Sequence, residues 1–282
     1  MKFTRKESGV VAEIEVLQSA IPGLRYHDTY QAVSTGPLIP GCAICTRMRH
    51  LSIPLGYRCN ADCPFCFAGA DYSGGPAENE DANRRVMLKK YARCPDDFDG
   101  VSFTGGEPLL YLAELEDCIR YIRSIRDDVH LWVYTNGIRA DREHCRLLKN
   151  MGIGEIRFNL AADNYGEKVL EHCAVAREIF DYVAVEVPSY PEQREKLIGC
   201  LDKLDRIGID QLNLQELLIT DANVRRLKGE GYETGLMFAK KFFLSGSRHM
   251  TYDVMRLCVE RNYAFTVNDC SARRFGFRRE QK

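Results

Sequence analysis

Residues 50–67 read HLSIPLGYRCNADCPFCF, where an apolar segment typical of a β-strand runs directly into three closely spaced cysteines. The strand-like part, 50–57, is the first of six similar segments, and the others lie at 100–106, 129–137, 155–162, 182–190 and 211–219. They are rich in β-branched and aromatic residues, and several are almost continuously apolar. Such runs are typical of parallel strands that are covered on both faces.

Segments with helical periodicity separate these strands. In 111–126 and 192–207 the apolar positions fall on one helical face, and Gly208 is expected to end the second of these helices. Further helices are expected near 80–93, 141–151 and 166–180. Strands that alternate with helices through right-handed crossovers predict an α/β fold, a partial barrel of six parallel strands.

The composition places limits on the class of protein. The chain has 282 residues, of which 45% are hydrophobic and 28% charged, and its formal net charge is −1. These values are typical of a soluble globular protein and argue against a protein that coats nucleic acid or binds a membrane surface. The N-terminus shows no apolar core of a signal peptide, and no segment approaches the about 20 apolar residues of a membrane span. We therefore expect a cytoplasmic protein whose twelve cysteines are reduced.

The strand and helix rhythm also divides the chain. We expect residues 1–48 to be an N-terminal extension that carries a CxxC pair, and 49–220 to form the barrel core. Residues 221–282 depart from the rhythm and are expected to form a C-terminal extension. Both extensions are predicted to pack over one face of the core.

The cysteines fall into scattered and clustered sets. One cysteine lies on the apolar face of each of four predicted helices, where a buried thiol behaves as a small hydrophobe: Cys118, Cys145, Cys173 and Cys200. Cys94 lies in a loop, and the sequence does not decide its role. The remaining seven are clustered and are candidate metal ligands: Cys42, Cys45, Cys59, Cys63, Cys66, Cys258 and Cys270.

The central trio is Cys59, Cys63 and Cys66, on the loop that follows the first strand. Parallel α/β folds bind their ligands at this edge of the sheet. A structural zinc site would normally add a fourth ligand from a second knuckle. The spacing is better suited to three corners of an iron–sulfur cubane, which leaves the fourth iron open to a small molecule.

The second predicted strand ends in FTGGEP, residues 103–108. Gly105 and Gly106 would allow the backbone to approach a ligand closely, and Glu107 could accept hydrogen bonds from an ammonium group. An ordinary turn between strand and helix is the alternative explanation of this segment taken alone.

Together and in this order, the two motifs resemble the radical S-adenosylmethionine superfamily. The match is a CxxxCxxC loop with an aromatic residue, Phe65, before its last cysteine, followed by GGE after the next strand. The resemblance covers about residues 50–220. It implies a [4Fe–4S] cluster that binds S-adenosylmethionine and cleaves it reductively to a 5′-deoxyadenosyl radical, which abstracts a hydrogen from a small-molecule or peptide substrate. It also implies a reductant such as flavodoxin or ferredoxin.

The resemblance also implies roles for particular residues. Phe65 would shield the cluster, and the end of the second strand would hold the methionine part of the cofactor. Other candidates for cofactor contacts lie near the ends of later strands. The full cofactor-binding set is Phe65, Thr104, Gly105, Gly106, Glu107, Asn136, Asn159 and Glu186. For the asparagines, turn capping is an equally ordinary explanation.

A second cysteine-ligated site is expected from Cys42, Cys45, Cys270 and Cys258, with an iron–sulfur cluster favoured over zinc. Cys258 lies on a predicted helix and could instead be a core residue, which would leave three thiolates able to bind substrate directly. The segments GCAIC, LNLQELLIT and DCSARR resemble a group related to the pyruvate formate-lyase activating enzyme. Within this narrower resemblance, Glu216 and Asn223 are candidate substrate contacts.

Two other functions remain open. An activase would abstract hydrogen from a glycine of a partner protein and would need an open barrel side. An iron–sulfur electron-transfer or carrier protein is the alternative of another class. A bacterial ferredoxin would need a fourth cysteine shortly after Cys66 and a far shorter chain, and this sequence has neither feature.

Overall fold

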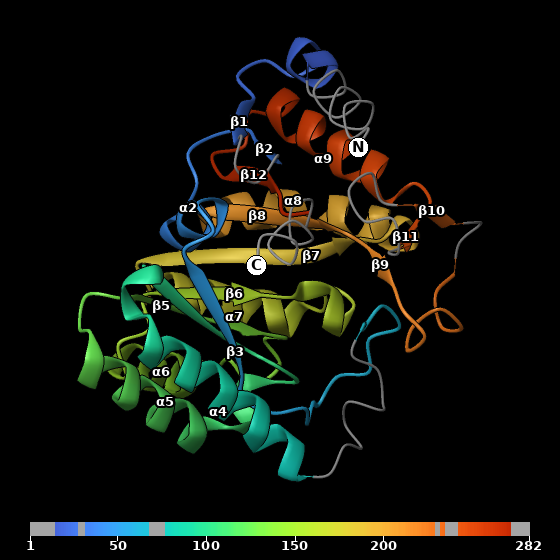
Figure 1. Cartoon of the computed structure of the whole chain (residues 1–282). Helices are drawn as coiled ribbons and strands as arrows, with labels where there is room; N and C mark the ends of the chain where they lie inside the picture. Colours follow the sequence, from blue (N-terminus) through green and yellow to red (C-terminus); the bar gives the residue numbers. More distant parts are fainter. Residues whose placement is uncertain (1–14, 28–31, 68–76, 229–231, 235–241, 272–282) are drawn as a thin grey trace, which may run out of the picture.

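The computed structural model describes residues 15–27, 32–67, 77–228, 232–234 and 242–271. Most of its strands form one nine-stranded sheet in the order β1-β2-β12-β8-β7-β6-β5-β4-β3 (Figure 1). A smaller sheet has the order β10-β11-β9. Within the described ranges the large sheet is open, with β1 and β3 at its two edges. No helix in this part of the chain is long and apolar enough to cross a membrane.

The middle of the large sheet is the predicted core. Each of the six predicted segments contains a strand, and neighbouring core strands run parallel. The six strands are β3 (His50–Pro54), β4 (Gly100–Thr104), β5 (His130–Thr135), β6 (Glu155–Phe158), β7 (Tyr182–Ser189) and β8 (Gln211–Glu216). The α/β class and the partial barrel of parallel strands are therefore confirmed.

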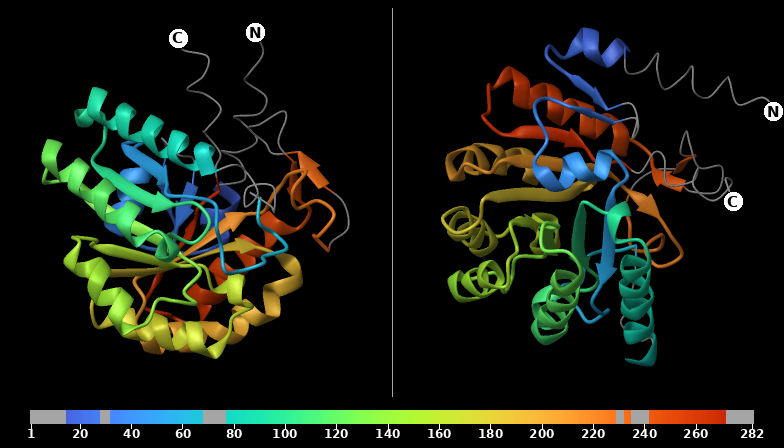
Figure 2. Two further views of the ribbon diagram at one scale, coloured as in Figure 1. Left: turned by 90° about the horizontal axis from the view of Figure 1, so that it is seen from below. Right: turned by 60° about the vertical axis from the view of Figure 1, so that its left-hand side comes forward.

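The predicted helices lie on the outer face of this sheet (Figures 1 and 2). They are α4 (Ala77–Arg93), α5 (Leu112–Ile125), α6 (Arg142–Asn150), α7 (Glu167–Arg177) and α8 (Arg194–Ile207). Short 3-10 turns precede or join them: η1 (Pro95–Asp97), η2 (Pro108–Leu110), η3 (Leu160–Asp163) and η4 (Pro191–Gln193). As predicted, Gly208 ends α8 in a left-handed conformation with φ 77°. The four scattered cysteines on α5, α6, α7 and α8 are all buried, which confirms their place in the core.

The described parts of both extensions add to the sheet beyond β8. The N-terminal extension contributes β1 (Arg25–His27), β2 (Ala32–Ser34) and α2 (Pro40–Thr46). The C-terminal extension contributes α9 (Ser247–Glu260) and β12 (Thr266–Asp269), and its β10 (Tyr232–Thr234) and β11 (Phe242–Leu244) form the smaller sheet with β9 (Leu218–Ile219), which lies at the end of the predicted core. β12 pairs parallel with β8, and β2 pairs antiparallel with β12 through Ser34 and Asn268. Strands from the two extensions therefore meet at one edge of the sheet.

The inner face of the sheet, opposite the outer helices, is covered in part by α2 (Figure 2). The amide of Gly41 donates to Glu155 Oε2 at 2.9 Å. A Cβ on Gly41 would lie 2.5 Å from Arg157 Nη2, so the helix can approach the sheet this closely only with glycine there. Ile44 reaches the start of β4 beside the ring of Trp132. The short helix thus closes the inner face near the amino ends of the strands.

Candidate functional site

The cysteine loop follows β3 at the carboxyl edge of the sheet. Cys59 is exposed, and Cys63 and Cys66 are half-buried. A turn brings the last two together, since the amide of Cys66 donates to the carbonyl of Cys63 at 3.2 Å. Burial first, and then the negative charges of Cys66 and Cys59, raise the pKa of Cys63 to about 12. The three sulfurs therefore act on one another electrostatically within one small region.

The two glycines after β4 are required by packing against this loop. The amide of Gly106 donates to the carbonyl of Gly56 at 2.7 Å, and that of Glu107 donates to the carbonyl of Arg58 at 2.9 Å. A Cβ on Gly105 would lie 2.3 Å from the oxygen of Gly56, and one on Gly106 would lie 2.1 Å from the oxygen of Arg58. In the structure the two glycines allow the start of the cysteine loop to pack against the end of β4, a role that neither the ligand nor the turn explanation had predicted.

Glu107 is fully buried, and it joins the ends of β4 and β5. Its Oε1 accepts hydrogen bonds from Thr135 Oγ1 at 2.7 Å and from the Leu109 amide at 3.1 Å. Its Oε2 accepts from the Asn136 amide at 2.7 Å. Burial raises the pKa of Glu107, while these hydrogen bonds oppose the shift. Because a carboxylate has about four acceptor positions, three are used here and one is left for the expected ammonium group.

The two candidate asparagines differ in their surroundings. Asn136 Nδ2 donates to Asn60 Oδ1 at 2.7 Å and lies 3.7 Å from Cys59 Sγ, so Asn136 supports the cysteine loop. Asn159 follows β6, and its buried Oδ1 has no hydrogen-bond partner among the described residues. Since a buried acceptor is costly to leave unpaired, a ligand hydroxyl or ammonium group would complete it. Thr104 is half-buried at the end of β4, beside the same glycines.

Phe65 and Asn223 contact each other and serve to hold the loop. Phe65 is buried, with its ring 6.4 Å from that of Tyr190. Asn223 is also buried, and its Nδ2 donates to the carbonyls of Phe65 at 3.1 Å and Leu218 at 2.9 Å. Its Oδ1 accepts from the Thr220 amide at 2.9 Å. The sequence suggested a substrate contact for Asn223, but its polar atoms are bonded to the backbone.

Segment 218–228 adds two more contacts to the same loop. Thr220 Oγ1 donates to the carbonyl of Phe67 at 3.1 Å, and Arg226 pairs with Asp62 Oδ1 at 2.7 Å. The other substrate candidate, Glu216, lies buried at the end of β8. It forms an ion pair with Arg248 of α9 at 2.9 Å. Glu216 therefore links β8 to α9.

A second group of thiols lies on the inner face of the sheet. It consists of Cys42 and Cys45 on α2 and Cys270 directly after β12. The pKa of Cys270 is raised first by burial and then by the negative charges of Glu186, Cys42 and Cys45. Burial raises the pKa of Cys42 to about 12, partly offset by the Arg157 charge. A shared metal site for these three cysteines stays a prediction, and the negative charge of Glu186 acts on two of them, Cys42 and Cys270.

Cys258 is not part of this group. It lies on α9, is 3% exposed and packs within the main hydrophobic core. Burial raises its pKa to about 12, and the charges that act on it are those of Arg261 and Asp205. Cys258 therefore does not lie where it could complete a four-cysteine site. Its position fits the other alternative, a core residue. Cys94 is exposed.

Sequence reasoning missed a buried ion-pair network next to α2 on the inner face of the sheet. Arg157 is 2% exposed, and its guanidinium pairs with Glu155 at 2.6 Å and Glu186 at 3.0 Å. Glu155 also contacts His130 at 3.0 Å. The available signal was a pair of charges two residues apart in a predicted strand, which places both side chains on one face.

No group of three or more His, Cys, Asp or Glu side chains in the described ranges is arranged to hold a single metal ion. In an iron–sulfur cubane each thiolate binds a different iron, so cluster ligands do not need to converge on one point. Three thiols on one loop suit such a cluster, and the unpaired Asn159 oxygen suits a ligand with donors. The residues present therefore fit both expected groups.

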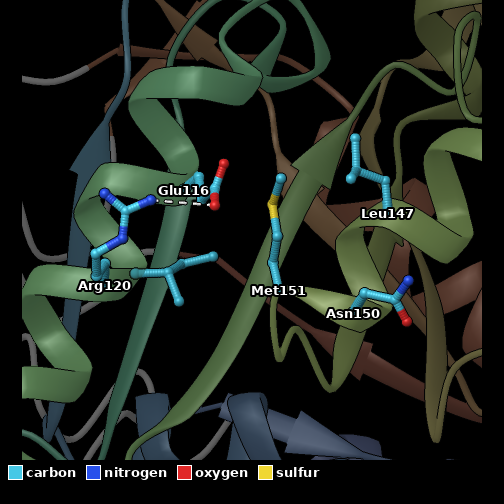
Figure 3. Close-up of a pocket in the computed structure, with 6 residues that line it drawn as sticks. Glu116, Arg120, Leu147, Asn150 and Met151 are labelled. Atoms are coloured by element: carbon cyan, nitrogen blue, oxygen red, sulfur yellow. Dashed lines mark hydrogen bonds and ion pairs between the residues drawn. The ribbon is translucent and has the colours of Figure 1, made fainter.

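A further pocket is lined by none of the candidate cluster or cofactor ligands. It lies between α5 and α6 on the outer side of the fold and is lined by Glu116, Ile119, Arg120, Leu147, Asn150 and Met151 (Figure 3). Glu116 and Arg120 pair with each other on α5 at 3.1 Å. None of its lining residues belongs to the two motifs or to the second thiol group.

The fold is an open α/β sheet of mainly parallel strands, and a loop with three cysteines follows its first core strand. This combination is typical of enzymes that bind an iron–sulfur cofactor at the carboxyl edge of the sheet. Residues 53–214 match the family model described as Radical SAM superfamily. The chain therefore belongs to the radical SAM superfamily of enzymes. Membership implies a [4Fe–4S] cluster and S-adenosylmethionine.

The chain is similar to several curated proteins. One is the "Putative glycyl-radical enzyme activating enzyme MJ0021" of Methanocaldococcus jannaschii, 23% identical over 208 residues, or 68% of this chain and 53% of the relative. Another is a GTP 3′,8-cyclase of Campylobacter jejuni, 26% identical over 172 residues, or 61% of this chain and 51% of the relative. The chain thus spans about half the length of these relatives.

Solved structures show the same fold. The Streptococcus suis protein SuiB bound to S-adenosylmethionine matches with a TM-score of 0.55 at 14% identity, over 79% of this chain and 50% of SuiB. Coproporphyrinogen III oxidase from Escherichia coli, described as a radical SAM enzyme, matches with a TM-score of 0.51 at 14% identity. That match covers 75% of this chain and 52% of the oxidase.

Proposed function

We propose that Cys59, Cys63 and Cys66 bind a [4Fe–4S] cluster and that the enzyme abstracts a hydrogen atom from a small-molecule or peptide substrate. The observation that carries the proposal is the three-thiol loop, held at the carboxyl edge of the sheet against the glycines after β4. Bound S-adenosylmethionine and a reduced cluster supply a 5′-deoxyadenosyl radical by one-electron cleavage of the sulfonium.

The chain's own residues position these groups and exclude water. Glu107 holds the ends of β4 and β5 in register, and its remaining acceptor position is proposed to receive the methionine ammonium group. Asn159 is proposed to bind a cofactor donor through its unpaired Oδ1. Asn136, Phe65 and Asn223 hold the cysteine loop and are proposed to fix the orientation of the cluster.

A second metal site is proposed from Cys42, Cys45 and Cys270. It is supported by the position of Cys42 and Cys45 on one short helix, and by the 4.0 Å between Cys42 Sγ and the Nδ2 atom of Asn268, two residues before Cys270. Thiolate ligands are typical of iron–sulfur clusters, whereas a structural zinc ion usually has four protein ligands. A flavodoxin or ferredoxin is the proposed reductant.

The covered inner face favours a small-molecule or peptide substrate. The helix α2 and strands from both extensions lie on or beside it, which limits the access of a large folded partner. A glycyl-radical activase is the second candidate, and the name of the Methanocaldococcus relative favours it. Hydrogen–deuterium exchange with and without a candidate partner protein distinguishes the two, because an activase protects its exposed barrel edge when the partner binds.

The cluster assignment is tested by cofactor cleavage. Anaerobically reconstituted protein, reduced with dithionite and given S-adenosylmethionine, is expected to release 5′-deoxyadenosine, which an electron carrier would not. Cys63→Ala is expected to abolish this release, whereas the control Cys173→Ala, in a fully buried core position of α7, keeps it. Cleavage by Cys63→Ala at the wild-type rate would remove the assignment of the loop.

A further inference from the structure

Three neighbouring strands present a row of polar side chains on the inner face of the sheet. Glu186 of β7 is the register partner of Asn213 of β8, and Asn213 is the partner of Asn268 of β12. The row is hydrogen-bonded, with Asn213 Nδ2 donating to Glu186 Oε2 at 3.1 Å and Asn268 Nδ2 to Asn213 Oδ1 at 2.9 Å. Cys270 follows Asn268 by two residues, so its side chain is expected on the same face.

Cys42 reaches this row from α2. Its Sγ accepts a hydrogen bond from Gln211 Nε2 at 2.9 Å and lies 3.5 Å from Asn213 Oδ1. Asn268 Nδ2 lies 4.0 Å from the same sulfur. The Asn213 amide therefore contacts Cys42 through one atom and Glu186 through the other. Amide N–H groups that donate to a metal-bound thiolate commonly hold that ligand in place.

Among the residues that the structure describes, only one carboxylate oxygen of Glu186 accepts hydrogen bonds. Within the described residues both of its hydrogen bonds, from Arg157 Nη1 at 3.0 Å and Asn213 Nδ2 at 3.1 Å, are made to Oε2. The two donors fix the carboxylate and leave Oε1 available as a ligand. Independently, Asn268 is 3% exposed and its Oδ1 has no hydrogen-bond partner in the described ranges, so the same row has another polar atom to satisfy.

We propose that Glu186 is the fourth ligand of the second metal site and binds one iron of its cluster through Oε1, with Cys42, Cys45 and Cys270 as the other ligands. This inference rests on the second site of the proposed function. An oxygen ligand is harder than a thiolate and binds iron less tightly, so this iron is the most readily lost or exchanged. Arg157 carries a positive charge beside the site and offsets part of the charge of its anionic ligands.

The test isolates the second site. In the full chain with Cys59→Ala, Cys63→Ala and Cys66→Ala, anaerobic reconstitution with ferrous iron and sulfide is expected to yield about four irons per chain. Adding Glu186→Gln, which keeps the size of the side chain, is expected to lower this to about three irons and to give the EPR signal of a three-iron cluster. Adding Glu186→Cys instead is expected to restore about four irons and to change the EPR signal of the reduced cluster.

Cys258→Ala in the same background is the control and is expected to keep the iron content, because this thiol lies in the core of α9. The proposal is overturned if Glu186→Gln leaves both the iron content and the EPR signal unchanged. It is also overturned if Cys258→Ala loses iron and Glu186→Gln does not. A background protein that binds no iron would refute the second site and this ligand together. Release of 5′-deoxyadenosine by the wild-type protein would still report on the first site separately.

Discussion

Replacement of Asn223 by alanine tests how the cysteine loop is held. Asn223 is fully buried and makes three hydrogen bonds, to the carbonyls of Phe65 and Leu218 and from the amide of Thr220. A typical intramolecular hydrogen bond contributes about 0.5–1.5 kcal/mol, so their loss is expected to lower the free energy of unfolding by about 2–4 kcal/mol. The effect should be strongest in the cysteine loop, because the bond to Phe65 anchors it directly.

Two measurements check this expectation on the metal-free protein. Urea unfolding gives the change in stability, and mass spectrometry after brief treatment with iodoacetamide gives the rate at which Cys63 is alkylated. Asn223→Ala is expected to speed this alkylation relative to wild type. Asn150→Ala, at the exposed end of α6, is the control and should change stability by less than about 0.5 kcal/mol.

The reasoning fails if Asn223→Ala unfolds at the wild-type urea concentration and Cys63 is alkylated no faster. In that case Asn223 would not hold the loop, and the substrate contact first suggested by the sequence would again be the better explanation. A loss of stability without faster alkylation would show that the hydrogen bonds matter but do not control the loop.

Three further perturbations probe the packing around the site. Gly106→Ala would place a Cβ 2.1 Å from a backbone oxygen, so a lower melting temperature and poor iron loading are expected. Gly199→Ala is the control, because a Cβ there meets no atom within 4 Å and alanine should stabilise α8. Equal melting temperatures of the two variants would contradict this expectation. Arg157→Met leaves the carboxylate of Glu155 buried without its cation and should cost about 3–5 kcal/mol in urea unfolding; a loss below about 1 kcal/mol would argue against the network. Burial lowers the pKa of His50 from 6.5 to about 4, so its protonation favours the unfolded chain. Stability should therefore fall as the pH decreases from 6.5 toward 4, by up to about 3 kcal/mol, and His50→Gln should flatten this part of the urea-derived profile.

The core of the fold could be predicted because its strands are apolar runs and its helices have clear periodicity. The edge strands could not, because β2 and β12 are short, with three and four residues, and are defined by pairing with strands far away in the chain. The helix α2 has only seven residues and begins at a proline, so no periodic pattern identifies it. The core strands were expected to be apolar on both faces, so the polar side chains around Arg157 on the inner face were not predicted.

The candidate site was predicted as far as its motifs extend. Spacing placed the three thiols of the first loop and the two upstream cysteines, since these positions are close in sequence. It could not show that Asn223 is bonded to the loop from 158 residues away, nor that Glu186 is bonded to Arg157 and Asn213. For Cys258 the sequence left two alternatives, and only the packing of α9 separates them.

The joining of the two chain ends has a consequence for the order of assembly. Val267 and Thr35 exchange hydrogen bonds across 232 residues, so β2 can pair with β1 early but with β12 only after residues 266–269 have been synthesised. Contacts of such high sequence separation form slowly. The first cysteine loop and its β4 partner can be in place during translation, whereas Cys42 must wait for Cys270. Iron is therefore expected to enter the site of the first cysteine loop earlier in biosynthesis than the proposed second site.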